Sequence, residues 1–197
     1  MNNEPPSDEN NKINHLEKTP WDNLIDMLWG EFDQSGLSKS EIMQICTDCL
    51  EEANCPYCFM RIAEIFTDIS EYSLAEETYK KAELLVVEAY DYIYLARSII
   101  DNFNLSWGMS ILSKGIMLTD LKPNYCDYSI IASVFACEVG DTLSAIKFYK
   151  IAESYAVSKH DFEFIANDVL EYLEDEFWYA ELIEKSKQIP EIQYNLN

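Results

Sequence analysis

One pattern of large and small apolar residues recurs along the chain at nearly constant intervals. Residues 59–66 read F-x2-I-A-x2-F, which places four apolar side chains at i, i+3, i+4 and i+7, on one face of an α-helix. Equivalent quartets begin at Tyr92, Tyr128 and Phe162, after successive intervals of 33, 36 and 34 positions. The repeat predicts an array of similar helical units, so the expected fold class is all-α.

A second helical segment follows each of the first three quartets. In it, small residues stand on both sides of a large one. The three sets are Ala75, Tyr79 and Ala82; Gly108, Leu112 and Gly115; and Ala145, Tyr149 and Ala152. Small side chains at these positions allow two helices to approach closely, and the large side chain fills the space between them. The segments are therefore expected to form pairs of antiparallel helices.

The order of these residues resembles the tetratricopeptide repeat, a helix–turn–helix unit with the pattern W-x2-L-G-x2-Y, then A-x3-F, then A. The resemblance implies antiparallel helix pairs stacked as a short α-solenoid of about ten helices. The third repeat has one extra residue between its helices, and the last pair matches the family only in its first helix. The expected organisation is a disordered acidic and polar tail (1–18), then a single helical domain (19–190) with a degenerate leading pair (20–53), three repeats (57–86, 90–119 and 126–156) and a capping pair (160–188).

The charge of the chain is strongly unbalanced. Thirty-six Asp and Glu residues stand against 14 Lys and Arg, and the formal net charge is −22. Such a charge repels nucleic acid and anionic membranes and attracts basic surfaces, so we expect a basic protein or peptide as partner. The alternative is that the acidic excess only keeps the protein soluble. No export signal and no apolar run long enough to span a bilayer is found, so with six cysteines we expect reduced thiols and a cytoplasmic protein.

Four cysteines are clustered as Cys46-x2-Cys49-x5-Cys55-x2-Cys58, a set that could supply four thiolates to zinc. The favoured interpretation is structural, because Cys46 and Cys49 fall on buried positions of the repeat, where cysteine behaves as a small hydrophobic residue. A metal site and a redox pair remain alternatives. Cys58 follows a helix start, where the dipole is expected to lower its pKa. The tetrapeptide at 55–58 resembles a glutaredoxin active site, although the strand–helix context is absent. No cofactor is expected, and zinc is the less favoured possibility.

The tetratricopeptide resemblance also implies a ligand groove lined by the first helix of each pair. The positions that it indicates are Tyr57, Met60, Glu64, Asp68, Tyr90, Ile93, Arg97, Asp101, Cys126, Ser129, Ser133, Glu163, Asn167 and Glu171. A subgroup of the family clamps a C-terminal carboxylate with Lys and Asn in this groove. Here Met60 and Glu64 stand in their place and only Asn167 fits, so we expect a basic or apolar ligand.

A second candidate surface lies near the C-terminus, where residues 161–184 contain no Lys or Arg. Nine acidic residues alternate with aromatic ones there: Asp161, Glu163, Asp168, Glu171, Glu174, Asp175, Glu176, Glu181 and Glu184, with Phe162, Phe164, Tyr172, Phe177, Trp178 and Tyr179. Acidic and aromatic side chains together suit a Lys- or Arg-rich partner. The alternative is a solvated capping pair whose aromatic side chains face the core.

Residues for catalysis are scarce. The chain has two histidines, no glycine-rich phosphate loop and no His-Glu-x-x-His motif, so no enzymatic activity is expected. The leading hypothesis is a non-catalytic protein-binding module, an acidic inhibitor or immunity-type protein that neutralises a basic partner such as a toxin nuclease. The alternatives are a secretion or assembly chaperone that holds an apolar segment in the groove, and a metal- or redox-linked protein that uses the clustered cysteines.

Overall fold

The computed structural model describes residues 36–189, and it divides them into two units, one ending at Glu52 and one beginning at Ala53. Every regular element within this range is helical. The expected all-α class of stacked helix pairs is confirmed. The predicted tail (1–18) and the first helix predicted for the leading pair lie outside the described residues.

The first unit contributes one described helix, α2 (Lys39–Glu52). Glu41 accepts hydrogen bonds from the backbone N–H (2.7 Å) and the hydroxyl (2.6 Å) of Ser38, just before the helix begins. These bonds satisfy donors that a helix start leaves without intrahelical partners. Ile42, Cys46 and Cys49 are its buried residues.

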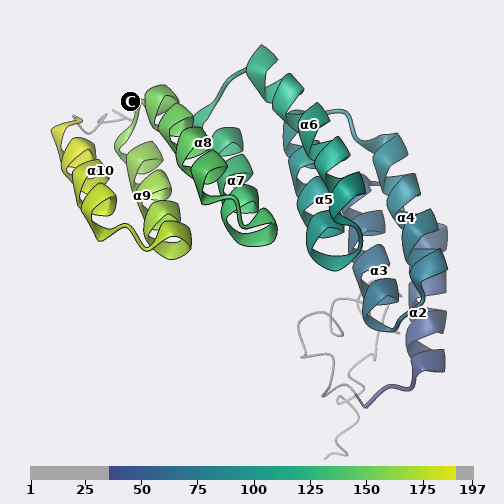
Figure 1. The fold of residues 1–197 in the computed structure, drawn as a ribbon. Coiled ribbons are helices and arrows are strands. Elements are labelled where there is room, and N and C mark those ends of the chain that lie inside the picture. Colours follow the sequence, from purple (N-terminus) through teal and green to yellow (C-terminus); the bar gives the residue numbers. More distant parts are fainter. Residues whose placement is uncertain (1–35, 190–197) are drawn as a thin grey trace, which may run out of the picture. The chain divides into compact units, whose positions relative to one another are not determined.

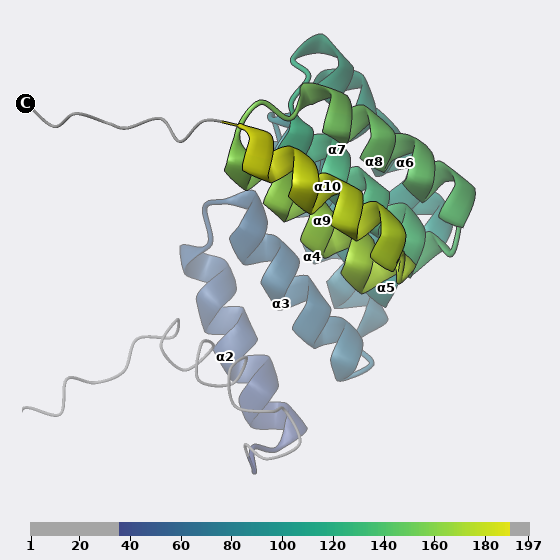
Figure 2. The same cartoon turned by 90° about the vertical axis from the view of Figure 1, so that its left-hand side faces the viewer.

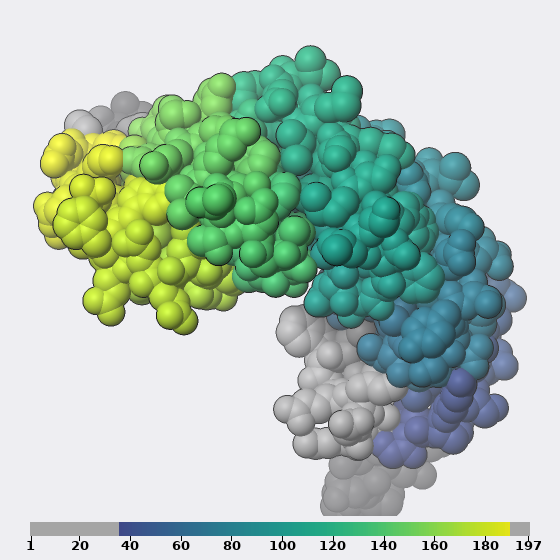
Figure 3. Space-filling model, in the orientation of Figure 1, coloured from purple at the N-terminus to yellow at the C-terminus, as the bar shows by residue number. Residues whose placement is uncertain are grey.

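The second unit consists of four helix pairs that follow one another in chain order (Figure 1). The colours of the space-filling view in Figure 3 follow the same order from teal to yellow. The pairs are α3 (Pro56–Asp68) with α4 (Tyr72–Leu85), α5 (Ala89–Asn102) with α6 (Leu105–Leu121), α7 (Tyr125–Val134) with α8 (Thr142–Tyr155), and α9 (Lys159–Leu173) with α10 (Glu176–Gln188). The first helices also pack on one another, α3 on α5, α5 on α7 and α7 on α9. Figure 2 shows α9 and α10 from the end of this unit. None of the described helices combines the length and apolar character needed to cross a membrane.

The core is made by the residues that carry the sequence repeat. Ile62, Ala63 and Phe66 of α3 are buried, as are the small residues of α4 and α8. A Cβ atom added to Gly108 of α6 would lie 2.9 Å from the carbonyl oxygen of Ala96 on α5. The small residues are therefore required by the closeness of paired helices, as the sequence predicted.

The extra residue of the third repeat is absorbed in a π-helical segment, Phe135–Val139, which continues α7. Tyr128 and Ala145 are 17 positions apart, whereas Tyr92 and Gly108, at the equivalent places one repeat earlier, are 16 apart. A π turn holds one more residue than an α turn, so the insertion is accommodated without breaking the helix. Gly140, with φ of +73°, ends the segment in the left-handed region that glycine adopts readily.

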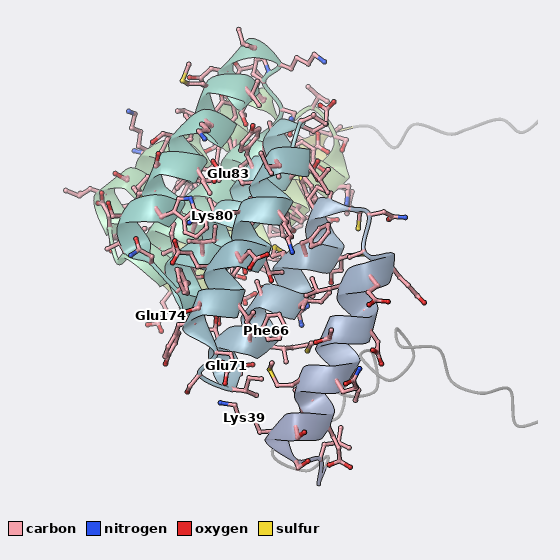
Figure 4. All side chains as sticks on the ribbon, turned by 90° about the vertical axis from the view of Figure 1, so that its right-hand side faces the viewer. Lys39, Phe66, Glu71, Lys80, Glu83 and Glu174 are labelled. Atoms are coloured by element: carbon pink, nitrogen blue, oxygen red, sulfur yellow. The ribbon has the colours of Figure 1, made fainter. Side chains whose placement is uncertain are left out.

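A longer repeat, of 70 or 71 residues, relates the helices α3–α6 to α7–α10. Glu83 of α4, labelled in Figure 4, accepts hydrogen bonds from Trp107 Nε1 (3.1 Å) and Lys114 Nζ (2.6 Å). Glu153 of α8 accepts the equivalent bonds from Trp178 Nε1 (3.2 Å) and Lys185 Nζ. The second unit is therefore two copies of a four-helix block.

The tyrosines beside these tryptophans show the same duplication. Tyr79 meets Trp107 edge-on, with ring centroids 6.1 Å apart, and Tyr149 meets Trp178 in the same way at 6.3 Å. The second helix of the last pair, α10, thus makes the contacts of α6 without the small–large–small pattern, which the sequence does not show there. Trp178, Leu182 and Ser186 of α10 stand 71 positions after Trp107, Ile111 and Gly115 of α6.

Candidate functional site

Two adjoining hollows lie between the first helices α3 and α5. The first, named here the tyrosine pocket, has a volume of about 240 Å³ and is lined by Pro56, Tyr57, Met60, Tyr90, Asp91, Tyr94 and Leu95. The second, named the polar groove, has a volume of about 380 Å³ and is lined by Tyr57, Met60, Arg61, Glu64, Tyr94, Arg97, Ser98, Asp101 and Asn102. Because they share Tyr57, Met60 and Tyr94, the hollows form one continuous groove along the two helices.

Aromatic rings dominate the tyrosine pocket. Tyr90 and Tyr94, one helical turn apart on α5, have ring centroids 4.3 Å apart, and their planes are tilted by 39°. Tyr57, in the first turn of α3, is 63% exposed. A hydrogen bond with Tyr94, burial and nearby negative charge raise the pKa of Tyr90 to about 12, so its ring is neutral at physiological pH.

A hydrogen-bonded chain runs through the wall of the polar groove. The hydroxyl of Ser98 donates to Glu64 Oε1 (2.6 Å) and lies 3.0 Å from the hydroxyl of Tyr79, while Arg61 pairs with the other oxygen of Glu64. Burial raises the pKa of Glu64, and the bond from Ser98 and the charge of Arg61 oppose the rise. Glu64 thus ties α3 to α5 and is already supplied with partners.

Polar contacts continue along the first helices of the later pairs. Arg97 of α5 donates from Nε to Glu138 Oε1 in the π segment (2.8 Å), and Ser129 of α7 donates to Asp168 Oδ2 of α9 (2.7 Å). Burial raises the pKa of Asp168 to about 6, against the effects of the Ser129 bond and the Arg97 charge. These bonds hold successive first helices together. The Ser129 hydroxyl of α7 is therefore already hydrogen-bonded within the protein.

The structure brings most of the groove residues predicted for the first two repeats together. Tyr57, Met60, Glu64, Tyr90, Arg97 and Asp101 all line the two hollows. Asp68 is exposed further along α3. Ile93 was wrongly placed in the groove, because it is fully buried where α5 meets Gly115 of α6. Tyr94 takes that place instead, and the sequence carries no signal that separates the two, because residues three and four positions after Tyr90 both share its helix face.

The groove positions predicted for the later pairs are less accessible. Ser129 and Ser133 are buried and hydrogen-bonded, so their prediction as positions that line an open groove was wrong, and Cys126 is half-buried. On α9, Glu163 lies 3.7 Å from Lys159, while Asn167 and Glu171 are exposed. None of these three residues lines the two hollows between α3 and α5.

Several acids of the segment 161–184 have structural roles. Asp161 forms a capping box with Ser158 at the start of α9, Asp175 caps α10, and Asp168 receives the Ser129 bond. Glu174, at the end of α9, and Glu176, the first residue of α10, are exposed. Trp178 is buried and most of the other aromatic side chains are half-buried, and only Phe177 is largely exposed, at 75%. The alternative interpretation, with the aromatic side chains turned to the core, accounts for most of this segment.

The cysteines differ from what the sequence suggested in one respect. Cys46 and Cys49 are buried, as the favoured interpretation expected. Cys55 caps α3, and its Sγ atom lies 2.8 Å from that of Cys58. The predicted lowering of the Cys58 pKa was wrong: burial, together with the bond to Cys55, outweighs the backbone hydrogen bonds that lower the pKa and raises it to about 11. Within the described part of the chain, no group of three or more ligating side chains is arranged to hold a metal ion.

Comparison of the chain with models of protein families, with characterised proteins and with solved structures finds no match. The fold therefore defines a class only, an all-helical array of antiparallel pairs. A function has to be argued from the groove between α3 and α5 and from the charge of the chain.

Proposed function

We propose that this protein is a non-catalytic binding module whose ligand is a basic protein or peptide. The observation that carries the proposal is the groove between α3 and α5, in which exposed tyrosines and carboxylates lie side by side. Tyrosine supplies a large contact area with few rotatable bonds and is enriched where binding energy is concentrated. The fold class supports the proposal in general terms, since the first helices of stacked pairs form a continuous ligand-sized surface.

The charges along the groove favour a cationic ligand. Of the two arginines that line it, Arg61 is paired with Glu64 and Arg97 with Glu138. Asp91 and Asp101 form no ion pair with any residue that the structure describes, so their charges remain available. In a chain with a net charge of −22, a basic ligand gains from both the local and the long-range field.

An inhibitor or immunity-type role fits these features. The cleft of a nuclease toxin is cationic because it binds phosphates, so an acidic protein can associate with it rapidly and block it. The tetratricopeptide-like organisation inferred from the sequence supplies a rigid scaffold for such a surface. The proposed partner is therefore a basic effector such as a toxin nuclease.

The test starts with co-purification of partners on the tagged full chain, followed by binding measurements with the isolated partner over a range of salt concentrations. We expect a basic partner whose affinity falls steeply with salt. Tyr57→Ala and Tyr90→Ala should weaken binding by about tenfold or more each. Tyr72→Ala is the matched control, because Tyr72 is exposed to a similar extent (57%) but belongs to the second helix α4. A complex insensitive to salt, or equally weakened by the control, would contradict the proposal.

A chaperone that holds an apolar segment is the second candidate, and the apolar part of the tyrosine pocket favours it. Pro56, Met60 and Leu95 line that pocket beside the tyrosines. In that case, truncation of Tyr57, Met60 and Tyr90 should abolish binding, whereas Asp91→Asn, Asp101→Asn and neutralisation of the exposed acids at Glu174 and Glu176 should leave it unchanged. The same variants thus distinguish the two roles.

A further inference from the structure

The tyrosine pocket differs from the polar groove in the charges that line it. Its described lining contains three tyrosines and one carboxylate and no Lys, Arg or His, whereas the polar groove contains two arginines beside two carboxylates, those of Glu64 and Asp101. The electron-rich face of an aromatic ring attracts a cation placed within about 6 Å of its centre. A cation entering the groove is therefore drawn to the tyrosine pocket and away from Arg61 and Arg97.

Asp91 is the only acid of the pocket lining, and its counterpart in the second four-helix block shows what is unusual about it. The counterpart, 70 positions later, is Asp161. Its carboxylate accepts hydrogen bonds from the backbone N–H groups of Val157 (2.8 Å) and Ser158 (2.9 Å) and from the Ser158 hydroxyl (2.6 Å). Asp161 is buried and fully used as a cap.

In α5 the residue at the same position, Asp91, does not cap the helix. Glu88 stands where Ser158 stands in the second block, and it makes no side-chain cap bond, so no capping box forms. Asp91 makes neither a hydrogen bond nor an ion pair with any residue in the described range. The position is half-buried and lines the same pocket as Tyr90, and the charge of Asp91 adds to the rise in the Tyr90 pKa. The pocket thus holds a carboxylate with unused acceptor capacity next to aromatic rings.

We propose that the tyrosine pocket binds the side chain of an arginine from the protein ligand, with the guanidinium against the tyrosine rings and its N–H groups on the Asp91 carboxylate. A planar guanidinium stacks on aromatic faces, pairs with a carboxylate through two parallel bonds and is less strongly hydrated than an ammonium group. The volume of about 240 Å³ is below the range usual for drug-sized ligands and suits a single side chain. An anion is disfavoured, because Asp91 already occupies the first turn of α5, where a helix start would otherwise attract one.

This inference rests on the proposed function for the source of the arginine, but the pocket can be tested without a partner. The probes are Nα-acetyl-L-arginine methylamide, its lysine analogue and its citrulline analogue, which keeps the shape of arginine without the charge. Each is titrated into the full-length ¹⁵N-labelled protein while backbone amide chemical shifts are followed. We expect saturable shifts at Tyr57, Tyr90, Asp91 and Tyr94 with the arginine compound, in the millimolar range, and binding of citrulline about tenfold weaker.

The variants Asp91→Asn and Tyr90→Leu should each weaken arginine binding by about tenfold. Tyr72→Leu and Glu77→Gln, on the exposed surface of α4, are matched controls and should leave it unchanged. Circular dichroism at helical wavelengths shows whether each variant is folded, and the isosteric Asp91→Asn change keeps the test valid if the tyrosine variant unfolds. Equal binding of citrulline and arginine, equal binding of lysine, shifts centred elsewhere or the lack of saturable binding would each overturn the proposal.

The outcomes also separate this inference from the proposed function. Capture of a basic protein in a salt-sensitive complex, without arginine binding in the pocket, would refute the pocket and retain the binding module. Arginine binding in the pocket, without any basic protein partner, would refute the proposed function and retain the pocket.

Discussion

Burial affects the pKa of single side chains in this protein more than their place on a helix does, and Cys58 gives a direct test. A thiol is alkylated as its thiolate, and with a pKa of about 11 only about one Cys58 in a thousand is ionised near pH 8. We expect iodoacetamide to modify Cys58 about a hundredfold more slowly than an unstructured cysteine peptide, with a rate that climbs as the pH approaches 11.

Mass spectrometry with fragmentation assigns the modified residue, which separates Cys58 from Cys55. A Cys58 that reacts faster than the peptide near pH 8 would show that the helix dipole prevails over burial after all.

Asp168 makes stability depend on pH in a predictable direction. Its pKa is about 6 in the folded protein against 3.8 for the free side chain, so the folded state holds the proton more tightly than the unfolded state. The stabilisation is complete below about pH 4 and is lost as the pH rises through about 6. Near pH 7.5, Asp168→Asn should therefore unfold at higher urea concentration than the wild type, by about 1 kcal/mol after allowance for solvent screening.

Asparagine keeps the acceptor for the Ser129 hydroxyl, so the comparison isolates the charge. The gain should vanish near pH 4, where Asp168 is protonated. The neighbouring charges contribute as well, Glu171 raising the pKa and Arg97 lowering it. Glu181→Gln, on the exposed face of α10, is the control, and an equal gain from it would assign the effect to net charge instead.

The sequence predicted the residues of the α3–α5 groove well, but not at every position. Tyr57, Met60, Tyr90 and Arg97 line the hollows as expected, because a helical repeat determines which face of each helix points inward. Ile93 and Tyr94 are adjacent and both have a large apolar part, so periodicity alone could not decide which of them lines the groove. Only the packing of Ile93 against α6, where Gly115 leaves room, shows which of the two turns away from the groove.

At the scale of helices, close approach of α5 and α6 depends on Gly108. A Cβ atom at this position would lie 2.4 Å from Ile100 Cγ1 and 2.9 Å from both the Ala96 carbonyl oxygen and the Ile100 amide nitrogen. The two backbone atoms cannot rotate away, so Gly108→Ala should force the helices apart. We expect a net loss of about 1–2 kcal/mol in urea unfolding, an overpacking cost partly offset by the better helix propensity of alanine.

Gly115→Ala is the internal comparison, because its nearest contact is a side-chain atom, Ile93 Cγ1, at 3.0 Å. The side chain can adjust, so the loss there should be smaller. If Gly108→Ala were the less damaging of the two, the tight contact between α5 and α6 would not exist in solution.

The π segment shows what a repeat pattern can and cannot reveal about an element. The sequence located one extra residue between the helices of the third repeat, but not the element that holds it. The chain keeps the residue inside the helix, from Phe135 to Val139, where Glu138 meets Arg97 of α5. Whether an insertion lengthens a turn or widens a helix depends on tertiary contacts. Here the contacting residues, Arg97 and Glu138, are 41 positions apart in the sequence, so a local pattern does not contain this information.

At the scale of the whole chain, the sequence pattern did not reveal the duplication of a four-helix block, because α10 lacks the small–large–small pattern of the other second helices. The block repeats its Glu–Trp–Lys contacts, yet its two copies have diverged on the side of the groove. Three tyrosines and Asp91 line the tyrosine pocket in the first copy, whereas in the second copy the matching Asp161 forms the capping box of α9. The same position thus lines the tyrosine pocket in the first copy and caps a helix in the second.

The net charge of −22 should make stability rise with salt. Carboxylates outnumber cations by more than two to one, so their mutual repulsion opposes the compact state, and added ions screen it. The exposed ion pairs, such as Lys80 with Glu76, are weakened by the same ions, but each contributes little. Raising NaCl from about 20 mM to about 500 mM near pH 8 should therefore increase the melting temperature by several degrees.

The control for this effect is the same titration near pH 4.2, the isoelectric point of the sequence. There about half of the carboxylates are protonated and the others balance the cations, so the net repulsion is gone, and the weakened ion pairs should leave the melting temperature level or slightly lower. Scanning calorimetry at both pH values gives the comparison. An equal rise in melting temperature at both pH values would indicate a general effect of salt on the hydration of apolar surface. It would contradict the prediction that repulsion between carboxylates lowers the stability of this chain.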